Sequence, residues 1–338
     1  MIPTRYLVAI GVLAVSACGM SGAGLGPAEP PSTAVVASIP IGDYGTDIAV
    51  HPDGARAYVT LRTNKVLAID TATRAVAATI TTGGQPAAIA LTPDGTRAYA
   101  MDMTAQSLFA LDTRHDALLA AIPVGIVARP ILTPSVAVAR DGAHAYVTNA
   151  TSDDDHLLIV DTATNRIVKD QFLPVHPAGV AASPDGTRVY VVGCKLACID
   201  GTLLTLDATT AAVTATLPLA AAPSGLVLAP DGRRAYVANG RDASVAIVEL
   251  PSGSVSTVSV SPQPLGIALH PNGRLLYVAS FGTGRIDVVD TLRESVVGRI
   301  NVAAMPRAIA IGPDGRFAYV THSLSSVSVI DLTKAAGS

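Results

Sequence analysis

The sequence predicts an all-β protein: a seven-bladed β-propeller closed by an N-terminal strand that completes the last blade. Three observations predict this fold. The 338 residues are 49% hydrophobic and 14% charged, with 29 Gly and 23 Pro, which is typical of short buried strands separated by turns. A Pro-Asp-Gly turn occurs seven times, once with Asn for Asp and once with Arg for Pro. The turns recur every 40 to 50 residues or so, roughly the length of one four-stranded propeller blade. Their central residues are Asp53, Asp94, Asp141, Asp185, Asp231, Asn272 and Asp314.

The first 33 residues are predicted to be an export and anchoring segment. Arg5 precedes the apolar run 7–15, which is too short to span a bilayer. The following Val-Ser-Ala-Cys, ending at Cys18, resembles the lipobox of bacterial lipoprotein signal peptides. That resemblance implies that residues 1–17 are a signal peptide and that Cys18 is lipidated; the alternative is an ordinary secretory signal with an incidental cysteine. Residues 18–33, rich in Gly, Pro and Ser, then form a flexible tether. We expect an exported protein anchored by its lipid to the outer side of a bacterial membrane.

Each repeat is predicted to contain four strands in the same order. In the first copy they cover residues 48–51, 57–61, 66–70 and 76–81, with the Pro-Asp-Gly turn after the first strand. Proline presets φ, the aspartate hydrogen-bonds its own turn, and glycine accepts positive φ. The acid that ends the third strand is expected to cap the next turn in the same way. These acids are Asp70, Asp112, Asp161, Asp207, Glu249, Asp290 and Asp331.

The two ends of the domain are predicted to pair. The last copy stops after its third strand, and residues 34–41 align with the fourth strands at 75–82 and 295–302. Residues 34–41 should therefore complete the last blade, which closes the ring and removes an exposed edge. The propeller then covers 34–332, and 333–338 form a C-terminal tail.

The second strand of the third copy carries Tyr146, Val147, Thr148 and Asn149, with near-copies at 58–60, 236–239 and 319–321. This pattern resembles the repeat of the YVTN β-propeller family, which includes YncE-like periplasmic proteins, and the match covers residues 34–332. The resemblance implies the scaffold but says little about function, because one fold serves many functions.

A ligand site is predicted where the loops before the first strand and after the second strand meet, at one mouth of the central channel. These loops differ most between the repeats, as functional loops on a rigid scaffold do. A rim that is polar only because it is wet would carry similar residues, so a specific site and a solvated rim both stay open. The candidate ligand-binding residues are Asp47, Arg62, Gln85, Asp102, Asn149, His176, Asn239, Arg241, Gln263, Arg307 and His322.

An acidic segment at 152–156 offers oxygen ligands for a divalent cation, with Asp153, Asp155 and His156 as the candidate ligands. The alternative is a solvated acidic loop, because neighbouring residues rarely all face one ion. With Cys18 assigned to the lipid, Cys194 and Cys198 remain as a pair, and export permits a disulfide between them. Free thiols and metal ligation are the alternatives for this pair.

Composition argues against several functions. A net charge of −3 and the absence of a Lys/Arg-rich run disfavour nucleic acid as a partner. Without Trp or a Cys-x-x-Cys-His segment, quinone and haem sites lose support, and no cofactor is expected. The leading hypothesis is a monomeric, membrane-tethered binding or scaffold module without catalytic activity, whose partner is an envelope protein or a small ligand. The alternative is a propeller-type hydrolase or lactonase, assisted by a metal.

Overall fold

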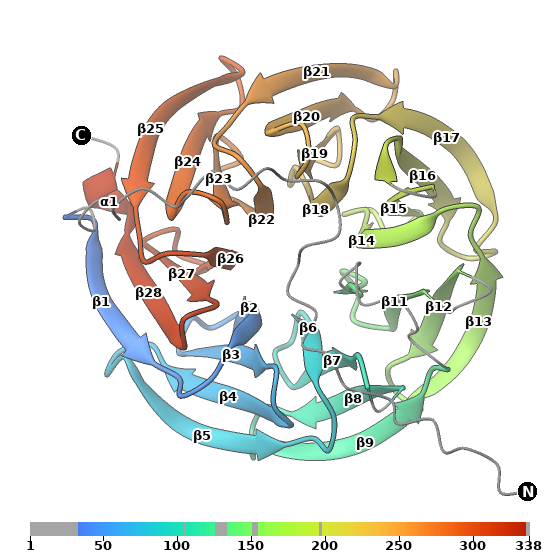
Figure 1. Ribbon diagram of the computed structural model, residues 1–338. Helices are drawn as coiled ribbons and strands as arrows, with labels where there is room; N and C mark the ends of the chain where they lie inside the picture. Colours follow the sequence, from blue (N-terminus) through green and yellow to red (C-terminus); the bar gives the residue numbers. More distant parts are fainter. Residues whose placement is uncertain (1–32, 105, 126–133, 151–154, 196–197, 336–338) are drawn as a thin grey trace, which may run out of the picture.

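The computed structural model describes residues 33–104, 106–125, 134–150, 155–195 and 198–335. The predicted signal peptide, Cys18, nearly all of the tether and Asp153 lie outside the described residues. The described chain forms seven antiparallel sheets of four strands each, arranged in a ring (Figure 1). This confirms the all-β, seven-bladed propeller predicted from the sequence.

Each sheet is one blade, and its strands follow one another from the centre of the ring outwards. Blades 1 to 3 consist of β2 (Gly45–Val50), β3 (Arg56–Leu61), β4 (Lys65–Asp70) and β5 (Ala75–Thr81); β6 (Pro86–Leu91), β7 (Arg97–Asp102), β8 (Ser107–Asp112) and β9 (Ala117–Pro123); and β10 (Val136–Val138), β11 (His144–Ala150), β12 (Asp155–Asp161) and β13 (Arg166–Phe172). Blades 4 to 6 consist of β14 (His176–Ala182), β15 (Arg188–Cys194), β16 (Gly201–Asp207) and β17 (Val213–Leu219); β18 (Pro223–Leu228), β19 (Arg234–Asn239), β20 (Ser244–Glu249) and β21 (Ser254–Ser259); and β22 (Pro264–Leu269), β23 (Leu275–Ser280), β24 (Arg285–Asp290) and β25 (Ser295–Asn301).

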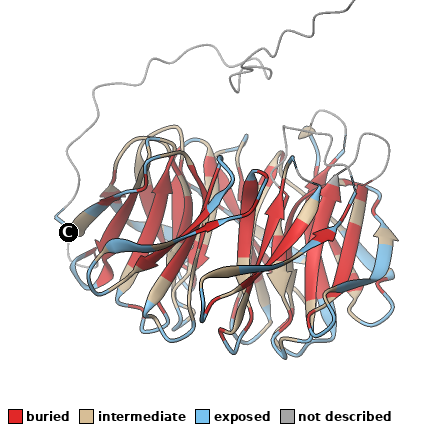
Figure 2. Ribbon diagram, turned by 90° about the horizontal axis from the view of Figure 1, so that it is seen from below, coloured by how far each residue is buried: buried red, intermediate tan, exposed pale blue. Residues whose placement is uncertain are grey.

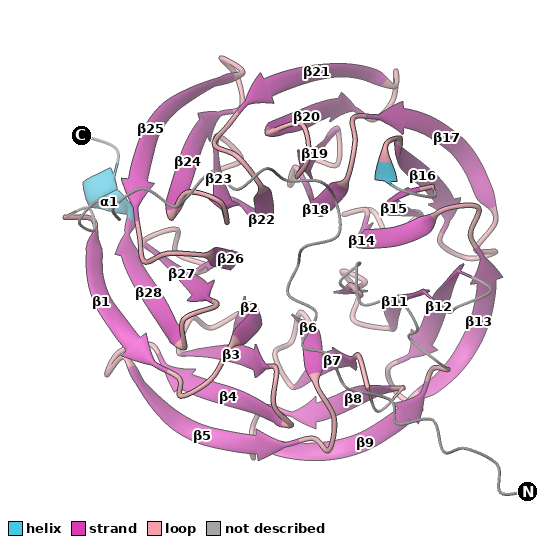
Figure 3. Cartoon of the chain, viewed as in Figure 1, coloured by secondary structure: helices cyan, strands magenta, loops and turns pink. Residues whose placement is uncertain are grey.

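Blade 7 joins the two ends of the domain. It contains β26 (Pro306–Ile311), β27 (Phe317–His322) and β28 (Ser326–Asp331), and β1 (Val35–Pro40) pairs antiparallel with β28 as its outermost strand. The predicted ring closure is therefore confirmed. The helix α1 (Leu332–Ala335) follows at the rim of the ring beside β1 and β25 (Figure 3). Its residues Leu332 and Ala335 are buried in one core cluster with Ala34, so packing continues into residues expected to form a tail.

The Pro-Asp-Gly turns form as their chemistry predicts. The carboxylate of Asp53 accepts the N–H of Ala55 at 2.8 Å, and Asp94 accepts the N–H of Thr96 at 3.0 Å. The glycines of all seven turns have positive φ, as the turn requires. We call the end of the ring that carries these turns the turn end. The opposite end, with the loops that enter each blade and those between its second and third strands, is the loop end.

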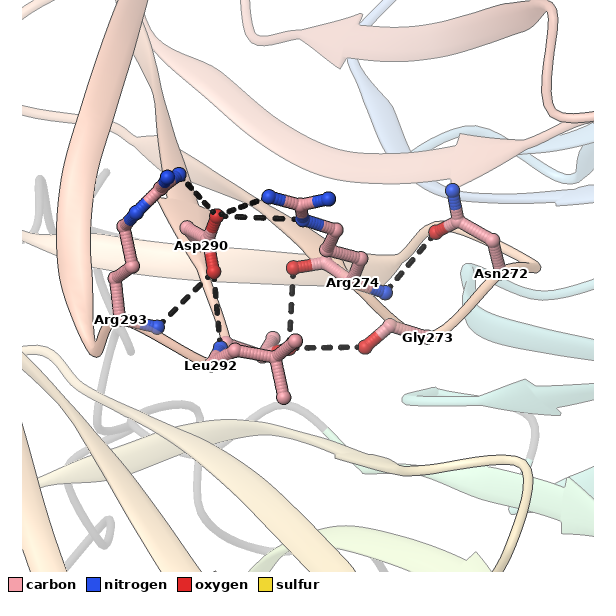
Figure 4. A network of polar contacts seen from close by, with 7 residues as sticks. Asn272, Gly273, Arg274, Asp290, Leu292 and Arg293 are labelled. Atoms are coloured by element: carbon pink, nitrogen blue, oxygen red, sulfur yellow. Dashed lines mark hydrogen bonds and ion pairs between the residues drawn. The ribbon is translucent and has the colours of Figure 1, made fainter.

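The acids that end the third strands cap the following turns, as expected. Asp290 Oδ1 accepts the N–H groups of Leu292 and Arg293, both at 3.0 Å (Figure 4). Its Oδ2 faces the guanidinium groups of Arg274 at 3.3 Å and Arg293 at 3.1 Å. Glu249 differs, because it pairs with Arg234 at 2.5 Å. The remaining acids accept a turn N–H as Asp290 does: Asp70, Asp112, Asp161, Asp207 and Asp331.

Neighbouring blades are joined at the turn end by a repeated hydrogen bond. The Tyr58 hydroxyl of β3 donates to the Thr113 carbonyl of the next blade at 3.0 Å, and Tyr99 donates to Thr162 O at 3.2 Å. Figure 2 shows buried residues concentrated inside the ring and exposed residues on the outermost strands and the turns. No helix among the described residues has the length and apolarity needed to cross a bilayer.

Candidate functional site

One backbone hydrogen bond at the loop end identifies equivalent positions in five blades. Its donor follows the second strand, and its acceptor precedes the first strand of the same blade. The donor–acceptor pairs are Arg62–Tyr44, Met103–Gln85, Gly240–Ala222, Phe281–Gln263 and Ser323–Met305, at 2.9 to 3.2 Å. Blade 1 thus has an arginine at the donor position and a tyrosine at the acceptor position. The other four blades have no charged residue at the donor position and no aromatic residue at the acceptor position.

These two residues meet a third at the junction between blades 1 and 7. The guanidinium carbons of Arg62 and Arg307 each lie 5.6 Å from the centroid of the Tyr44 ring. Arg307 Nη1 also donates to the Tyr44 hydroxyl at 3.2 Å, across 263 positions of sequence. Arg62 is exposed, whereas Tyr44 and Arg307 are half-buried. We call these three residues the Arg–Tyr–Arg cluster.

Asp47 lies next to this cluster and links the innermost strands of blades 1 and 2. Its Oδ1 accepts the N–H of Ile48 at 2.8 Å, and its Oδ2 accepts the N–H of Ile89 at 2.9 Å. Burial raises the pKa of Asp47 to about 6, although both hydrogen bonds and the charge of Arg307 act in the opposite direction. Part of the Asp47 population is therefore protonated near pH 6.

Four candidate residues are not on the rim where sequence reasoning placed them. Asp102, Asn149, Asn239 and His322 are at most 3% exposed. Each still belongs to the second strand of its blade, whose two faces are covered by the neighbouring blades. The expected loop begins one or two residues later, so these side chains still lie between the neighbouring blades.

Three of these buried residues form hydrogen bonds at the loop end. The Asn149 amide donates to the Val124 carbonyl, in the segment that enters blade 3. Asp102 Oδ1 accepts the N–H of Thr104 at 2.6 Å, and Asn239 Nδ2 donates to Ser244 Oγ at 3.3 Å. They stabilise the loop end from inside the blades.

His322, the fourth of these buried residues, has an imidazole whose pKa is shifted by burial. Its Nε2 lies 2.8 Å from Ser328 Oγ, and burial lowers the pKa of the imidazole from 6.5 to about 4. The ring is therefore neutral at physiological pH.

The remaining candidate residues come from different blades. Gln85 in blade 2 and Arg241 in blade 5 are exposed, and Gln263 in blade 6 is half-buried. His176 in blade 4 places its Nδ1 against Asp155 Oδ2 of blade 3, which links the two blades.

The structure separates the two described members of the predicted metal site. Asp155 faces His176, whereas the next residue on β12, His156, turns to Asp170 at 2.5 Å and meets the Phe172 ring edge-on. Adjacent strand residues point to opposite faces, so these two side chains diverge. Within the described ranges no three His, Cys, Asp or Glu side chains group as metal ligands.

Cys194 and Cys198 are joined by a disulfide, with their Cα atoms 4.9 Å apart. Cys194 pairs with His176 across β14 and β15, so the disulfide lies at the loop end beside the Asp155–His176 pair.

A cavity of about 240 Å³ lies between blades 2 and 3 at the turn end. Its lining includes Asp94, Arg97 and Thr162. Asp94 already accepts hydrogen bonds from its own turn, and Arg97 donates to the Thr162 carbonyl. These groups belong to the framework of the ring.

No protein-family model matches this chain, and comparison with curated proteins found no match. Among solved structures, hydrazine synthase from Kuenenia stuttgartiensis is similar, with a TM-score of 0.77 and 22% sequence identity. The match covers 85% of this chain and 95% of that one. The likeness shows the propeller fold alone. Because 1747 solved chains match the structure, the fold does not select a function.

Proposed function

We propose that this chain is a non-catalytic binding propeller, exported and held at the outer side of a bacterial membrane by a lipid on Cys18. It presents its loop end to an envelope protein or a small ligand. The observation that supports this most is the Arg–Tyr–Arg cluster, where residues from blades 1 and 7 converge. The lipobox-like Val-Ser-Ala-Cys, the tether and the resemblance to YVTN repeats support the location.

The residue types of this cluster suit recognition. Tyr and Arg are enriched among the residues that contribute most to binding, because each combines a large contact area with polar groups. The half-buried Tyr44 and Arg307 are held by their mutual hydrogen bond, so less conformational freedom is lost when a partner binds. The ring places this surface at one end of a rigid scaffold.

Capture from the membrane envelope tests this function. The full-length lipidated chain is immobilised and incubated with detergent-solubilised envelope, beside an unrelated lipoprotein of similar size. We expect a reproducible partner or small ligand to be retained by the propeller alone. Equal recovery from both columns across repeated preparations would count against a binding role.

One observation favours a second function, a propeller-type hydrolase. Burial raises the pKa of Asp47, at the loop end, to about 6, which suits a general base better than the usual value of 3.8. A screen of lactones and esters tests it: turnover that disappears in Asp47→Ser would support catalysis. Ser is the matched replacement, because Ser135 fills this position in blade 3 and accepts the Val180 N–H at 3.3 Å.

A further inference from the structure

We propose that the Arg–Tyr–Arg cluster binds a carboxylate group of the ligand. This inference rests on the proposed binding function and names the ligand chemistry that the function leaves open.

The cluster offers hydrogen-bond donors from three side chains. Each guanidinium carries five N–H donors in a planar fork that matches the two oxygens of a carboxylate. The Tyr44 hydroxyl accepts a hydrogen bond from Arg307 and keeps its own hydrogen for another acceptor. The guanidinium carbons of Arg62 and Arg307 are at most twice 5.6 Å apart, because each lies that far from the Tyr44 centroid. One small ligand can therefore reach both.

The free cluster holds two like charges around one ring. The two cation–π contacts with Tyr44 offset part of the repulsion between the arginines. A bound anion removes the remaining repulsion and gains charge-assisted hydrogen bonds.

The surrounding acids favour a carboxylate over a phosphate dianion. Asp43 directly precedes Tyr44, and its Oδ1 accepts the Tyr44 N–H at 2.6 Å. Asp47 lies near enough to Arg307 for the two charges to interact. These two carboxylates add negative charge beside the cluster, so a group that carries one negative charge, as each carboxylate of succinate does, is favoured over a group that carries two.

Comparison between blades shows that the ring does not need these side chains. Blade 2 has Gln85 and Met103 where blade 1 has Tyr44 and Arg62. Arg307 lies two residues after Met305, whose carbonyl accepts the loop-end hydrogen bond of blade 7. In blades 1, 2, 4, 5 and 6 the position equivalent to Arg307 carries Thr46, Ala87, Ala178, Ser224 and Leu265. Three departures from the repeat thus meet at one place.

Calorimetric titration of the folded full-length chain with succinate tests the inference. The variants are Arg62→Met and Arg307→Ala, which introduce the blade 2 residues, and the matched control is Lys65→Ser. Lys65 is the exposed first residue of β4, directly after the loop that carries Arg62, and Ser107 begins the corresponding strand in blade 2. We expect saturable binding by the wild-type chain and by Lys65→Ser, with affinity about tenfold or more weaker in each arginine variant. Thermal midpoints close to wild type confirm that the variants are folded.

Three results would overturn the inference: no saturable succinate binding, equal weakening in Lys65→Ser, or inorganic phosphate binding as tightly as succinate. An arginine variant that fails to fold is replaced by Tyr44→Gln, for which the same loss is expected. Envelope capture separates the two proposals. A partner retained without succinate binding leaves the binding function standing and removes the carboxylate assignment. Succinate binding without a captured partner leaves the carboxylate assignment standing and removes the envelope protein as the partner.

Discussion

His322 is expected to make the propeller sensitive to mild acid. In the folded chain burial lowers the pKa of its imidazole from 6.5 to about 4. The unfolded chain therefore binds more protons between these two values, so the free energy of unfolding falls as the pH falls through this window. At 1.36 kcal/mol per pKa unit, the loss is roughly 3 kcal/mol between pH 6.5 and pH 4.

Replacement of His322 by Asn isolates this contribution. Asn is the matched residue, because Asn149 and Asn239 fill the same strand position in blades 3 and 5. We would measure the free energy of unfolding in urea at a series of pH values between about 7 and 4, for the wild-type chain and for His322→Asn. Over this range the wild-type value should fall by roughly 3 kcal/mol more than the value for His322→Asn. Parallel curves would refute the reasoning, because the buried imidazole would then not be the group that titrates.

Three further predictions concern other parts of the chain. Asp47 has the opposite pH dependence: its folded pKa of about 6 lies above its usual 3.8, so its stabilisation is present below pH 3.8 and is lost as pH rises through 6. Asp47→Ser should flatten that decline by about 1–3 kcal/mol in the same urea experiment, and an unchanged slope would contradict it. Gly95→Ala should cost more stability than Gly186→Ala, because a Cβ added at Gly95 would clash with His51 Nε2, whereas a Cβ added at Gly186 meets nothing within 4 Å. Both glycines have positive φ, so the second variant measures the backbone cost of about 1 kcal/mol, and equal denaturation midpoints would exclude the clash. Cys18→Ser should move the protein from the membrane fraction to the soluble extracytoplasmic fraction, and retention on the membrane would remove the lipid anchor from the account.

The fold could be predicted because its signals are local and repeated. Seven turns with the same chemistry set the number of blades, and the missing strand after Asp331 indicated which segment closes the ring. The end of the second strand was harder to predict. Asp102 and His322 are polar residues beside a loop, a pattern that also describes an exposed rim, and only the packing of neighbouring blades shows that they are buried.

The candidate site could not be predicted without knowing which loops lie side by side in three dimensions. Arg62 and Arg307 were candidates, but nothing in the sequence shows that both contact Tyr44. A usable signal was present, because all three residues differ from their equivalents in blade 2. Ring closure makes blades 1 and 7 neighbours, so it also predicts that Arg307 of blade 7 lies near Tyr44 and Arg62 of blade 1.

Envelope capture with a variant that replaces the whole cluster tests the central claim most directly. The variant Tyr44→Gln, Arg62→Met and Arg307→Ala introduces the blade 2 residues Gln85, Met103 and Ala87, and Lys65→Ser again serves as the charge control. We expect the wild-type chain and Lys65→Ser to retain the same partner or ligand and the triple variant to lose it, with all three chains folded. Undiminished retention by the triple variant would contradict the account, because recognition would then lie elsewhere on the ring.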